Sequence, residues 1–178
     1  PREHPPRRAL IGELRQQLAE HVEQVAIPRY WRFVETLPSN AQGKLDRALI
    51  GRLFEDMDDR SKPRWLGSEQ RDSQRCQISL EVPERLIFLD GHFDQFPIVP
   101  GVVIVQWVIE LAQRSFGALG DFSSCEQLKF QRPMRPGMRL QLELTRRENG
   151  VAFVYHSHEG RHANGRISFT ADKEAAHD

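Results

Sequence analysis

A loop histidine, a helix-opening glycine and two polar residues mark the stretch of sequence best equipped for chemistry. Residues 89–110 read LDGHFDQFPIVPGVVIVQWVIE, with His92 in the loop and Gly101 at the start of an apolar run. Histidine exchanges protons near neutral pH, and a backbone N–H at a helix start can stabilise an oxyanion. Gln106 and Glu110 follow, one helical turn apart. A carboxylic acid in apolar surroundings can donate a proton, whereas an amide can only orient a hydroxyl group. His92 and Glu110 could thus exchange protons, and Gly101 and Gln106 could bind and orient a substrate, although a lone histidine such as His92 is more often an ordinary loop residue.

Three polar side chains share one side of this apolar segment if it is helical. Gln106, Glu110 and Gln113 are separated by four and three residues, which places them in one row. Such a row on an otherwise buried helix has two explanations. It lines a binding site, or it is a set of satisfied hydrogen bonds at a dimer interface. The spacing alone leaves both open.

The elements that must position these residues are predicted from periodicity. The segment from residue 101 is apolar nearly all round, so other elements must cover it on most sides. From Cys76 onward, apolar and polar residues alternate as in half-buried strands, and PG, NG and EG pairs mark tight turns. The predicted strands read CQISLEV, LKFQRP, MRLQLELTRR, GVAFVYHSHE and RHANGRISFTA. We expect an α+β fold in which a curved antiparallel sheet wraps around one long central helix.

The part of the chain before residue 74 has a different pattern. Apolar residues recur every fourth position in a charged stretch, at Leu10, Leu14, Leu18 and Val22. This spacing predicts an amphipathic helix that Pro28 ends, followed by a short strand over 30–37 and a helix over 45–54. Residues 55–74 lack periodicity, which is typical of a linker. The expected organisation is a small α/β domain over 1–54, a linker over 55–73, the helix-and-sheet domain over 74–172 and a tail over 173–178.

Composition excludes several classes of protein. The 178 residues contain 25 Lys+Arg and 25 Asp+Glu, so no overall field favours nucleic acid. Cys76 and Cys125 lack the spacing of a disulfide framework or a zinc site. Residues 98–112 are too few to span a membrane and no secretory signal is visible, so we expect a cytoplasmic protein. Neither a metal nor a cofactor is predicted, because no further ligands complete the histidine cluster at 156, 158 and 162. The chain begins PREHPPRR without an initiator methionine, which suggests a fragment.

The stretch VPERLIFLDGHFDQFPIVPG, residues 82–101, resembles the 3-hydroxyacyl-acyl-carrier-protein dehydratases of the hot-dog fold. Those enzymes carry a GHFPGxPxxPG loop before the central helix, and KFQRPMRPGMRL resembles their following strand and turn. The similarity covers residues from about 74 to 170 and is nearest to the dehydratase-like branch associated with aryl polyene gene clusters. It implies a hot-dog fold, a homodimer joined edge to edge, an active site shared across the dimer, and a thioester substrate on acyl carrier protein or CoA. The residues that keep the loop pattern are Gly91, His92, Phe93, Pro97, Pro100 and Gly101.

The sequence departs from this family pattern in the loop and on the helix. Asp94 and Gln95 stand where the family usually has Pro-Gly. Gln106 stands where the family has Glu or Asp, and Glu110 where a glutamine commonly follows. In the implied dehydration, His92 removes the proton alpha to the carbonyl and an acid protonates the departing hydroxide. Because Gln106 transfers no proton, either His92 shuttles both protons, or Glu110 reaches in, or the reaction has changed. We therefore expect weakened or specialised dehydration.

The resemblance also implies a substrate tunnel and a surface for the carrier protein. The predicted substrate-binding residues are Phe93, Phe96, Val99, Pro100, Trp107 and Phe130. Most of these apolar residues suit core packing as well as a tunnel wall. Three arginines, Arg132, Arg135 and Arg139, suit either contact with an acidic carrier protein or solvation in turns.

A second stretch, AIPRYWRFVETLPSNAQGKLDRALI at residues 26–50, resembles the C-terminal end of adenylate-forming ligases, the acyl- and aryl-CoA synthetase superfamily. In that family the lysine of the Gly-Lys pair reaches the acyl phosphate, which implies that Lys44 is a remnant adenylation lysine. The sequence has no phosphate loop and no large nucleotide-binding domain. We expect a partial subdomain from a larger fused polypeptide, with a solvated loop lysine as the alternative for Lys44.

The function predicted from these features is dehydration of 3-hydroxyacyl thioesters on acyl carrier protein, in fatty acid or aryl polyene type biosynthesis. Two alternatives stay open. A hot-dog acyl thioesterase would release thiol without forming an enoyl product. A non-catalytic module for thioester binding or dimerisation would bind the acylated carrier without turnover, and Gln106 is the residue that favours it.

Overall fold

The computed structural model describes residues 7–34, 36–40, 42–55, 59–89 and 97–170. The chain forms two compact units, Pro1–Glu35 and Thr36–Asp178. The first unit contains α1 (Arg7–Ala19) and the 3-10 helix η1 (Gln24–Ala26). The elements of the second unit are α2 (Arg47–Arg52), β1 (Arg64–Asp72), β2 (Arg75–Glu81), the 3-10 helix η2 (Ile87–Leu89), α3 (Gly101–Phe116), β3 (Asp121–Phe130), β4 (Arg139–Arg147), β5 (Gly150–Ser157) and β6 (Gly160–Thr170).

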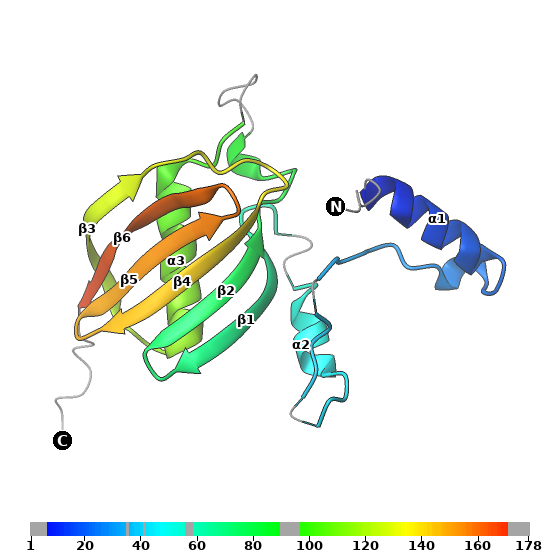
Figure 1. The fold of residues 1–178 in the computed structure, drawn as a ribbon, viewed down its shortest axis with the longest axis horizontal. Helices are drawn as coiled ribbons and strands as arrows, with labels where there is room; N and C mark the ends of the chain where they lie inside the picture. The colour runs from blue at the N-terminus through cyan, green and yellow to red at the C-terminus, as the bar shows by residue number, and fades with distance from the viewer. Residues whose placement is uncertain (1–6, 35, 41, 56–58, 90–96, 171–178) are drawn as a thin grey trace. The chain divides into compact units, whose positions relative to one another are not determined.

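The second unit is an antiparallel sheet of six strands in the order β1-β2-β4-β5-β6-β3. Strands β4, β5 and β6 follow one another through tight turns, whereas β2 pairs with β4 and β3 pairs with β6 across longer stretches of chain. Figure 1 shows the sheet curving around α3, with β1 and β3 at its two edges. The predicted arrangement of one central helix and a wrapped antiparallel sheet is confirmed. The four strands that follow the helix do not pair in simple sequence order, because β3 lies at the sheet edge beside β6.

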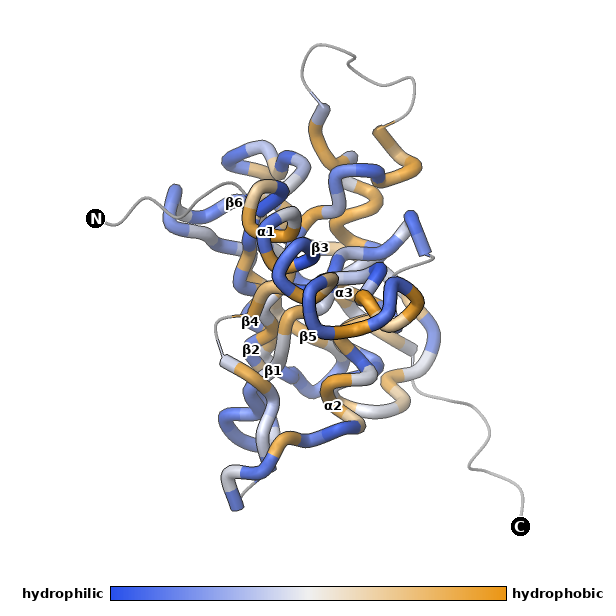
Figure 2. Tube along the Cα trace, turned by 90° about the vertical axis from the view of Figure 1, so that its right-hand side faces the viewer, coloured by the Kyte–Doolittle hydropathy of each residue, from blue (hydrophilic) through white to orange (hydrophobic). Residues whose placement is uncertain are grey.

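The core lies between α3 and the concave face of the sheet. On α3 the buried residues are Val103, Ile104, Trp107, Val108, Leu111 and Ala112, and the apolar positions of this helix can be followed in Figure 2. Alternate residues of the strands face them, as the period of two requires. Tyr155 on β5 is fully buried, and burial raises the pKa of its hydroxyl. That hydroxyl has no hydrogen-bond partner within the described parts of the chain.

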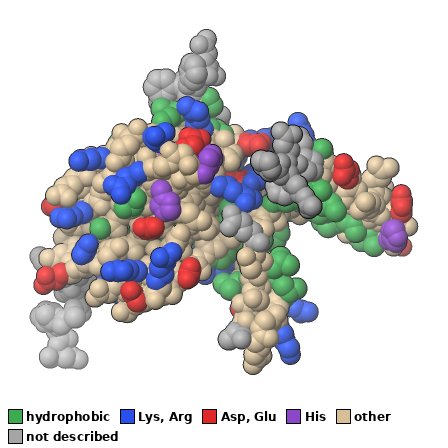
Figure 3. Space-filling model, viewed as in Figure 1, with side chains coloured by type: hydrophobic (Ala, Val, Ile, Leu, Met, Phe, Trp, Pro, Cys, Tyr) green, Lys and Arg blue, Asp and Glu red, His purple; other side chains and the backbone are tan. Residues whose placement is uncertain are grey.

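The outer face of the sheet is polar. Figure 3 shows basic, acidic and histidine side chains interspersed across this face. Cross-strand hydrogen bonds link polar side chains on this face, including one from Gln77 Nε2 to Gln141 Oε1 at 3.2 Å. Such pairs add modest stability to neighbouring strands. None of the described helices is long and apolar enough to cross a membrane.

The N-terminal half differs from the sequence predictions in three places. Residues 64–72, expected within a linker, form strand β1 and pair with β2 over seven residue pairs. Helix α1 ends at Ala19 rather than at Pro28, because the chain turns there, with His21 N–H donating to the Leu18 carbonyl at 3.0 Å. The strand expected over 30–37 does not form in its described residues.

Helix α2 belongs to the same compact unit as the sheet, so the unit begins earlier in the sequence than residue 74. Asp46 caps the helix, and its Oδ1 accepts hydrogen bonds from the N–H groups of Ala48 and Leu49 at 2.9 and 3.1 Å. Leu53, directly after the helix, is 3% exposed. The expected domain boundary after residue 54 therefore falls inside a packed region.

Candidate active site

The start of α3 is built on a close contact between Gly101 and Phe130. The Pro100 carbonyl accepts hydrogen bonds from the N–H groups of Val103 and Ile104 at 3.0 and 3.1 Å. A Cβ atom at residue 101 would lie 2.8 Å from the Phe130 ring. Glycine therefore allows β3 and the helix start to approach closely. Two residues predicted to bind substrate, Pro100 and Phe130, thus lie beside the predicted oxyanion donor.

Gln106 and Glu110 form one polar unit on α3. The Gln106 Nε2 donates a hydrogen bond to Glu110 Oε1 at 3.1 Å, as the spacing of four residues allows. Gln106 is exposed and Glu110 is half-buried. Gln113 continues the row and is also exposed, and Val102 at its start is 75% exposed. The row therefore points away from the core, and a site wall or an interface remains its predicted role.

The chain on both sides of the predicted base is tied down. His92, Phe93 and Phe96 lie outside the described residues, and their roles stay predictions. Before them, the Leu89 N–H closes η2 by donating to the Leu86 carbonyl at 3.1 Å. After them, Val99 is buried, and its N–H donates to the carbonyl of Met134 at 2.9 Å. The strand connection that carries Met134 therefore fixes the approach to α3.

Trp107 is part of the core and is tied to a loop that the sequence did not single out. Its side chain is 1% exposed, and its Nε1–H donates to the Ser61 carbonyl at 2.9 Å. Ser61 belongs to residues 59–63, which we call the 59–63 loop. The Asp59 carboxylate accepts hydrogen bonds from the Ser61 hydroxyl and N–H, and these bonds lower the pKa of Asp59. Substrate contact by Trp107 stays a prediction.

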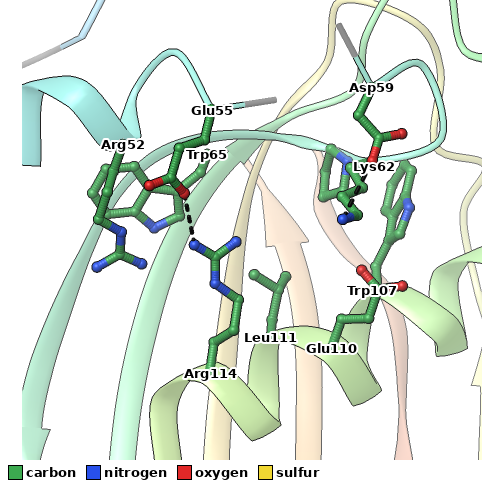
Figure 4. A pocket seen from close by; sticks show the side chains of 10 residues that line it. Arg52, Glu55, Asp59, Lys62, Trp65, Trp107, Glu110, Leu111 and Arg114 are labelled. Carbon is green, nitrogen blue, oxygen red and sulfur yellow. Dashed lines mark hydrogen bonds and ion pairs between the residues drawn. The ribbon is translucent and has the colours of Figure 1, made fainter. Parts of the chain in front are cut away.

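A pocket of about 180 Å³ lies between the 59–63 loop, β1 and α3. Figure 4 shows the Arg114 guanidinium pointing toward Glu55, with Nη2 to Oε2 at 3.0 Å. The Arg52 guanidinium lies 4.6 Å from the centroid of the Trp65 ring. Glu110 lines the same pocket. The lining has three cations, Arg52, Lys62 and Arg114, and three carboxylates, Glu55, Asp59 and Glu110, so the pocket holds no surplus positive charge for an anion.

The three arginines predicted to face a carrier protein have different environments. Arg139 lies beside the buried Glu81, with Nε to Oε2 at 3.6 Å. Arg64 donates from Nη1 to Glu81 Oε1 at 2.9 Å, and these three residues are cross-strand neighbours. Arg139 therefore has a structural role at the end of the sheet. Arg132 and Arg135 are exposed on the β3–β4 connection, where a partner could reach them.

The three C-terminal histidines do not converge on one point. His156 lies on the outer face, with Nε2 3.1 Å from Glu143 Oε1 on β4, and His158 is exposed. His162 is fully buried, with Nε2 2.8 Å from Ser157 Oγ and Nδ1 3.2 Å from the Pro133 carbonyl. A carbonyl oxygen only accepts, so Nδ1 carries the proton and Nε2 accepts from the hydroxyl. Among the described residues no group of three or more ligand-type side chains could hold a metal ion.

Lys44 is exposed at the end of a tight loop. Ser39 and Leu45 form an isolated antiparallel bridge, and the Asn40 side chain accepts the N–H of Lys44 at 3.0 Å. The turn uses Gly43 at φ 77°, a conformation that glycine adopts without strain. The lysine is therefore displayed on a compact hairpin, and its predicted role in adenylation stays a prediction.

The fold, one central helix wrapped by an antiparallel sheet, is that of a hot-dog protein, and solved structures agree. One is the dehydratase heterocomplex ApeI:P from Xenorhabdus doucetiae, 32% identical with a TM-score of 0.56, covering 60% of this chain and 96% of that chain. Another, an uncharacterised protein from Erwinia carotovora subsp. atroseptica, is 30% identical with a TM-score of 0.56, covering 63% of this chain and 98% of that one. The predicted α+β hot-dog fold is confirmed.

Residues 68–166 match the ApeI-like family, described as ApeI dehydratase, and the chain belongs to that family. The 3-hydroxyacyl-[acyl-carrier-protein] dehydratase FabZ of Ruminiclostridium cellulolyticum is 35% identical over 98 residues, 48% of this chain and 69% of that protein. FabZ of Bacillus cereus is 34% identical over 68 residues, 33% of this chain and 47% of that protein. The chain thus spans about half the length of several curated relatives that it matches.

Proposed function

We propose that this chain dehydrates 3-hydroxyacyl thioesters to enoyl thioesters. The observation that carries the proposal is the Gln106–Glu110 hydrogen bond on α3 of an ApeI-like chain. It sets an amide and a carboxylic acid side by side on the face of the helix that points away from the core. The same helix begins at Gly101, where a backbone N–H can stabilise negative charge.

In the proposed reaction, His92 takes the proton alpha to the thioester carbonyl, and the N–H of Gly101 stabilises the enolate oxygen. The C–O bond at the beta carbon then breaks as Glu110 gives a proton to the leaving hydroxide, so water departs. Gln106 orients the Glu110 carboxyl through the 3.1 Å hydrogen bond. The backbone positions of residues 106 and 110 are separated by about 6 Å along the helix axis. The substrate must therefore lie further along α3 than an acid at position 106 would require, so we expect weakened or specialised dehydration.

The proposed assembly is a homodimer joined through β3, acting on an acyl carrier protein thioester in the cytoplasm. Strand β3 is an edge strand, and it exposes Phe122, Leu128 and Phe130 by 49%, 37% and 49%. Exposed apolar residues on an unpaired edge favour pairing with another chain. Arg132 and Arg135 would meet the acidic carrier. A different hot-dog chain is the alternative partner, since the ApeI:P structure is a heterocomplex.

We also propose that residues 1–54 derive from an adenylating ligase fused upstream, with Lys44 as its remnant lysine. The exposed hairpin at residues 39–45 supports this, because an adenylation lysine must reach a substrate held elsewhere. The test of this origin adds the purified chain to an adenylating partner domain and measures the rate of pyrophosphate release. Loss of the added rate with Lys44→Ala is the expected result, and an unchanged rate would contradict it.

The test of the main proposal follows enoyl absorbance and free thiol together, with carrier-bound and CoA-bound 3-hydroxyacyl thioesters. We expect enoyl formation without thiol release. Thiol release alone would make the protein a thioesterase. Gln106 favours a second candidate, a non-catalytic thioester-binding module, because an amide transfers no proton. Tight binding of acylated carrier with silence in both channels would establish that candidate instead.

A further inference from the structure

A second hollow adjoins the pocket of Figure 4 and differs from it in charge. Its volume is about 190 Å³, and it shares the side chains of Arg52, Trp65 and Arg114 with that pocket. We call this space, between β1 and the end of α3, the β1–α3 hollow. No Asp or Glu is among the described residues that line it, whereas the pocket of Figure 4 has three carboxylates. The hollow therefore gathers two cations without a carboxylate in its own lining.

Arg52 is a cation without a carboxylate partner in the described chain. It is the last residue of α2, and its guanidinium lies 4.6 Å from the centroid of the Trp65 ring. Figure 4 shows its side chain beside this ring, which is itself buried. Contact with an aromatic face holds a guanidinium in place but leaves the N–H donors at its edge available. Arg52 can therefore offer two parallel donors to an oxyanion.

Arg114 is the second cation of the hollow, in the last turn of α3. Its Nη2 lies 3.0 Å from Glu55 Oε2, and the two side chains are 51% and 56% exposed. An ion pair between side chains this exposed contributes little, because water and dissolved ions compete with it. A bound anion can therefore engage Arg114 in competition with Glu55.

Neutral hydrogen-bonding groups complete the lining of the β1–α3 hollow. Ser68 and Gln70 line it from β1, and Ser115 lines it from α3, directly after Arg114. With Arg52 on α2, donors approach the space from three different elements. A planar carboxylate has two oxygens to receive such donors, whereas a phosphate group has at least three and carries more charge. The arrangement thus suits a phosphate group better than a carboxylate.

We propose that the β1–α3 hollow binds a small phosphate-type oxyanion through Arg52 and Arg114. The anion is free phosphate or the phosphate group of a monoester, since both present the same acceptor oxygens. The site is separate from the proposed dehydration, because no step of that reaction uses a residue of this hollow. It also gives a role to Arg52, which lies outside the part of the chain that resembles the dehydratases.

The first test is calorimetric titration with inorganic phosphate at an ionic strength held constant with sodium chloride. We expect a Kd of about 1 mM, because both cations are partly open to water. Arg52→Gln should raise the Kd at least about tenfold. Arg166→Gln is the matched control, because Arg166 is exposed on β6 and does not line the hollow. It should bind phosphate as the wild type does. Phenyl phosphate distinguishes the two sources, since tighter binding than that of phosphate identifies a monoester as the ligand.

A gain-of-binding variant separates a binding role from structural damage. Glu55→Gln frees Arg114 and should tighten phosphate binding about threefold, whereas Glu69→Gln, exposed on β1 outside the hollow, should not. Phosphate should also raise the thermal midpoint of the wild type more than chloride does at equal ionic strength. Binding that is undetectable beyond the effect of chloride would refute the site. Equal affinities of Arg52→Gln and Arg166→Gln, or acetate binding as tightly as phosphate, would refute it too. None of these results depends on enoyl formation.

Discussion

Replacing Gln106 with glutamate places a second carboxylate beside Glu110 and tests which group supplies the acid. The Gln106 Nε2 lies 3.1 Å from Glu110 Oε1, so the introduced carboxylate would lie close to the existing one. Two like charges about 4 Å apart repel by about 1 kcal/mol in water and about 4 kcal/mol at the effective dielectric of a protein surface. Because Gln106 is exposed and Glu110 half-buried, an intermediate value applies. A repulsion of about 2 kcal/mol changes an equilibrium constant about thirtyfold.

The sign of the pH effect follows from this repulsion. A like charge disfavours ionisation, so in Gln106→Glu the repulsion should raise the pKa of the second carboxyl of the pair to ionise. The protonated carboxyl is the form that donates. Gln106→Glu should therefore dehydrate faster than the wild type, with the greatest advantage at acidic pH. Its advantage should fall as the pH rises through that raised pKa.

The assay records enoyl absorbance against pH for the wild type, Gln106→Glu and the exchanged variant Gln106→Glu/Glu110→Gln. The exchanged variant carries one carboxylate, so it should gain activity without the raised pKa. Gln74→Glu, in the β1–β2 turn, controls for the added charge. A profile of Gln106→Glu that parallels the wild type at every pH would refute the assignment of the acid to this pair. A gain in activity of Gln106→Glu over the wild type that persists undiminished at high pH would refute the same assignment.

Three further predictions concern the packing around the site. Gly101→Ala would place a Cβ 2.8 Å from the Phe130 ring, so urea titration should show a loss of about 1–3 kcal/mol in the free energy of unfolding. Phe130→Leu in the same chain should recover part of that loss, and an unchanged midpoint in Gly101→Ala would contradict the contact. Tyr155→Phe removes a buried hydroxyl without a partner in the described chain, so the same titration should show equal or higher stability rather than a loss. Burial raises the pKa of the Cys76 thiol, which keeps the thiol protonated at pH 8. Its alkylation, followed by mass spectrometry, should therefore be slower than that of a free thiol and should accelerate only at higher pH.

The central helix and most of the sheet could be predicted because their patterns are local. Helix α3 starts where the Pro100–Gly101 pair predicts, and β2, β4, β5 and β6 follow the alternation of apolar and polar residues. Strand β1 was missed for a physical reason. Its residues read RWLGSEQRD, most of them exposed at a sheet edge, and Gly67 lies at a register shift. A strand that buries few residues on either face leaves little periodic signal.

The candidate site could be predicted only where spacing along one element decides it. Gln106 and Glu110 meet because residues four apart on a helix are neighbours. The 59–63 loop could not be found this way. The hydrogen bond between Trp107 and Ser61 joins residues 46 apart, and its acceptor is a backbone carbonyl, which every residue type provides. The contact of Phe130 with Gly101 likewise depends on how β3 packs on the helix start.

The most direct test of the central claim is His92→Ala in the paired enoyl and thiol assay on a carrier-bound 3-hydroxyacyl thioester. The thermal midpoint of the substituted chain is the control. An unchanged midpoint shows that a loss of activity comes from the missing imidazole and not from unfolding. We predict that the wild type forms enoyl product without releasing thiol and that His92→Ala loses enoyl formation by at least about a hundredfold. Enoyl formation that survives in His92→Ala, or thiol release as the only activity of the wild type, would contradict the account.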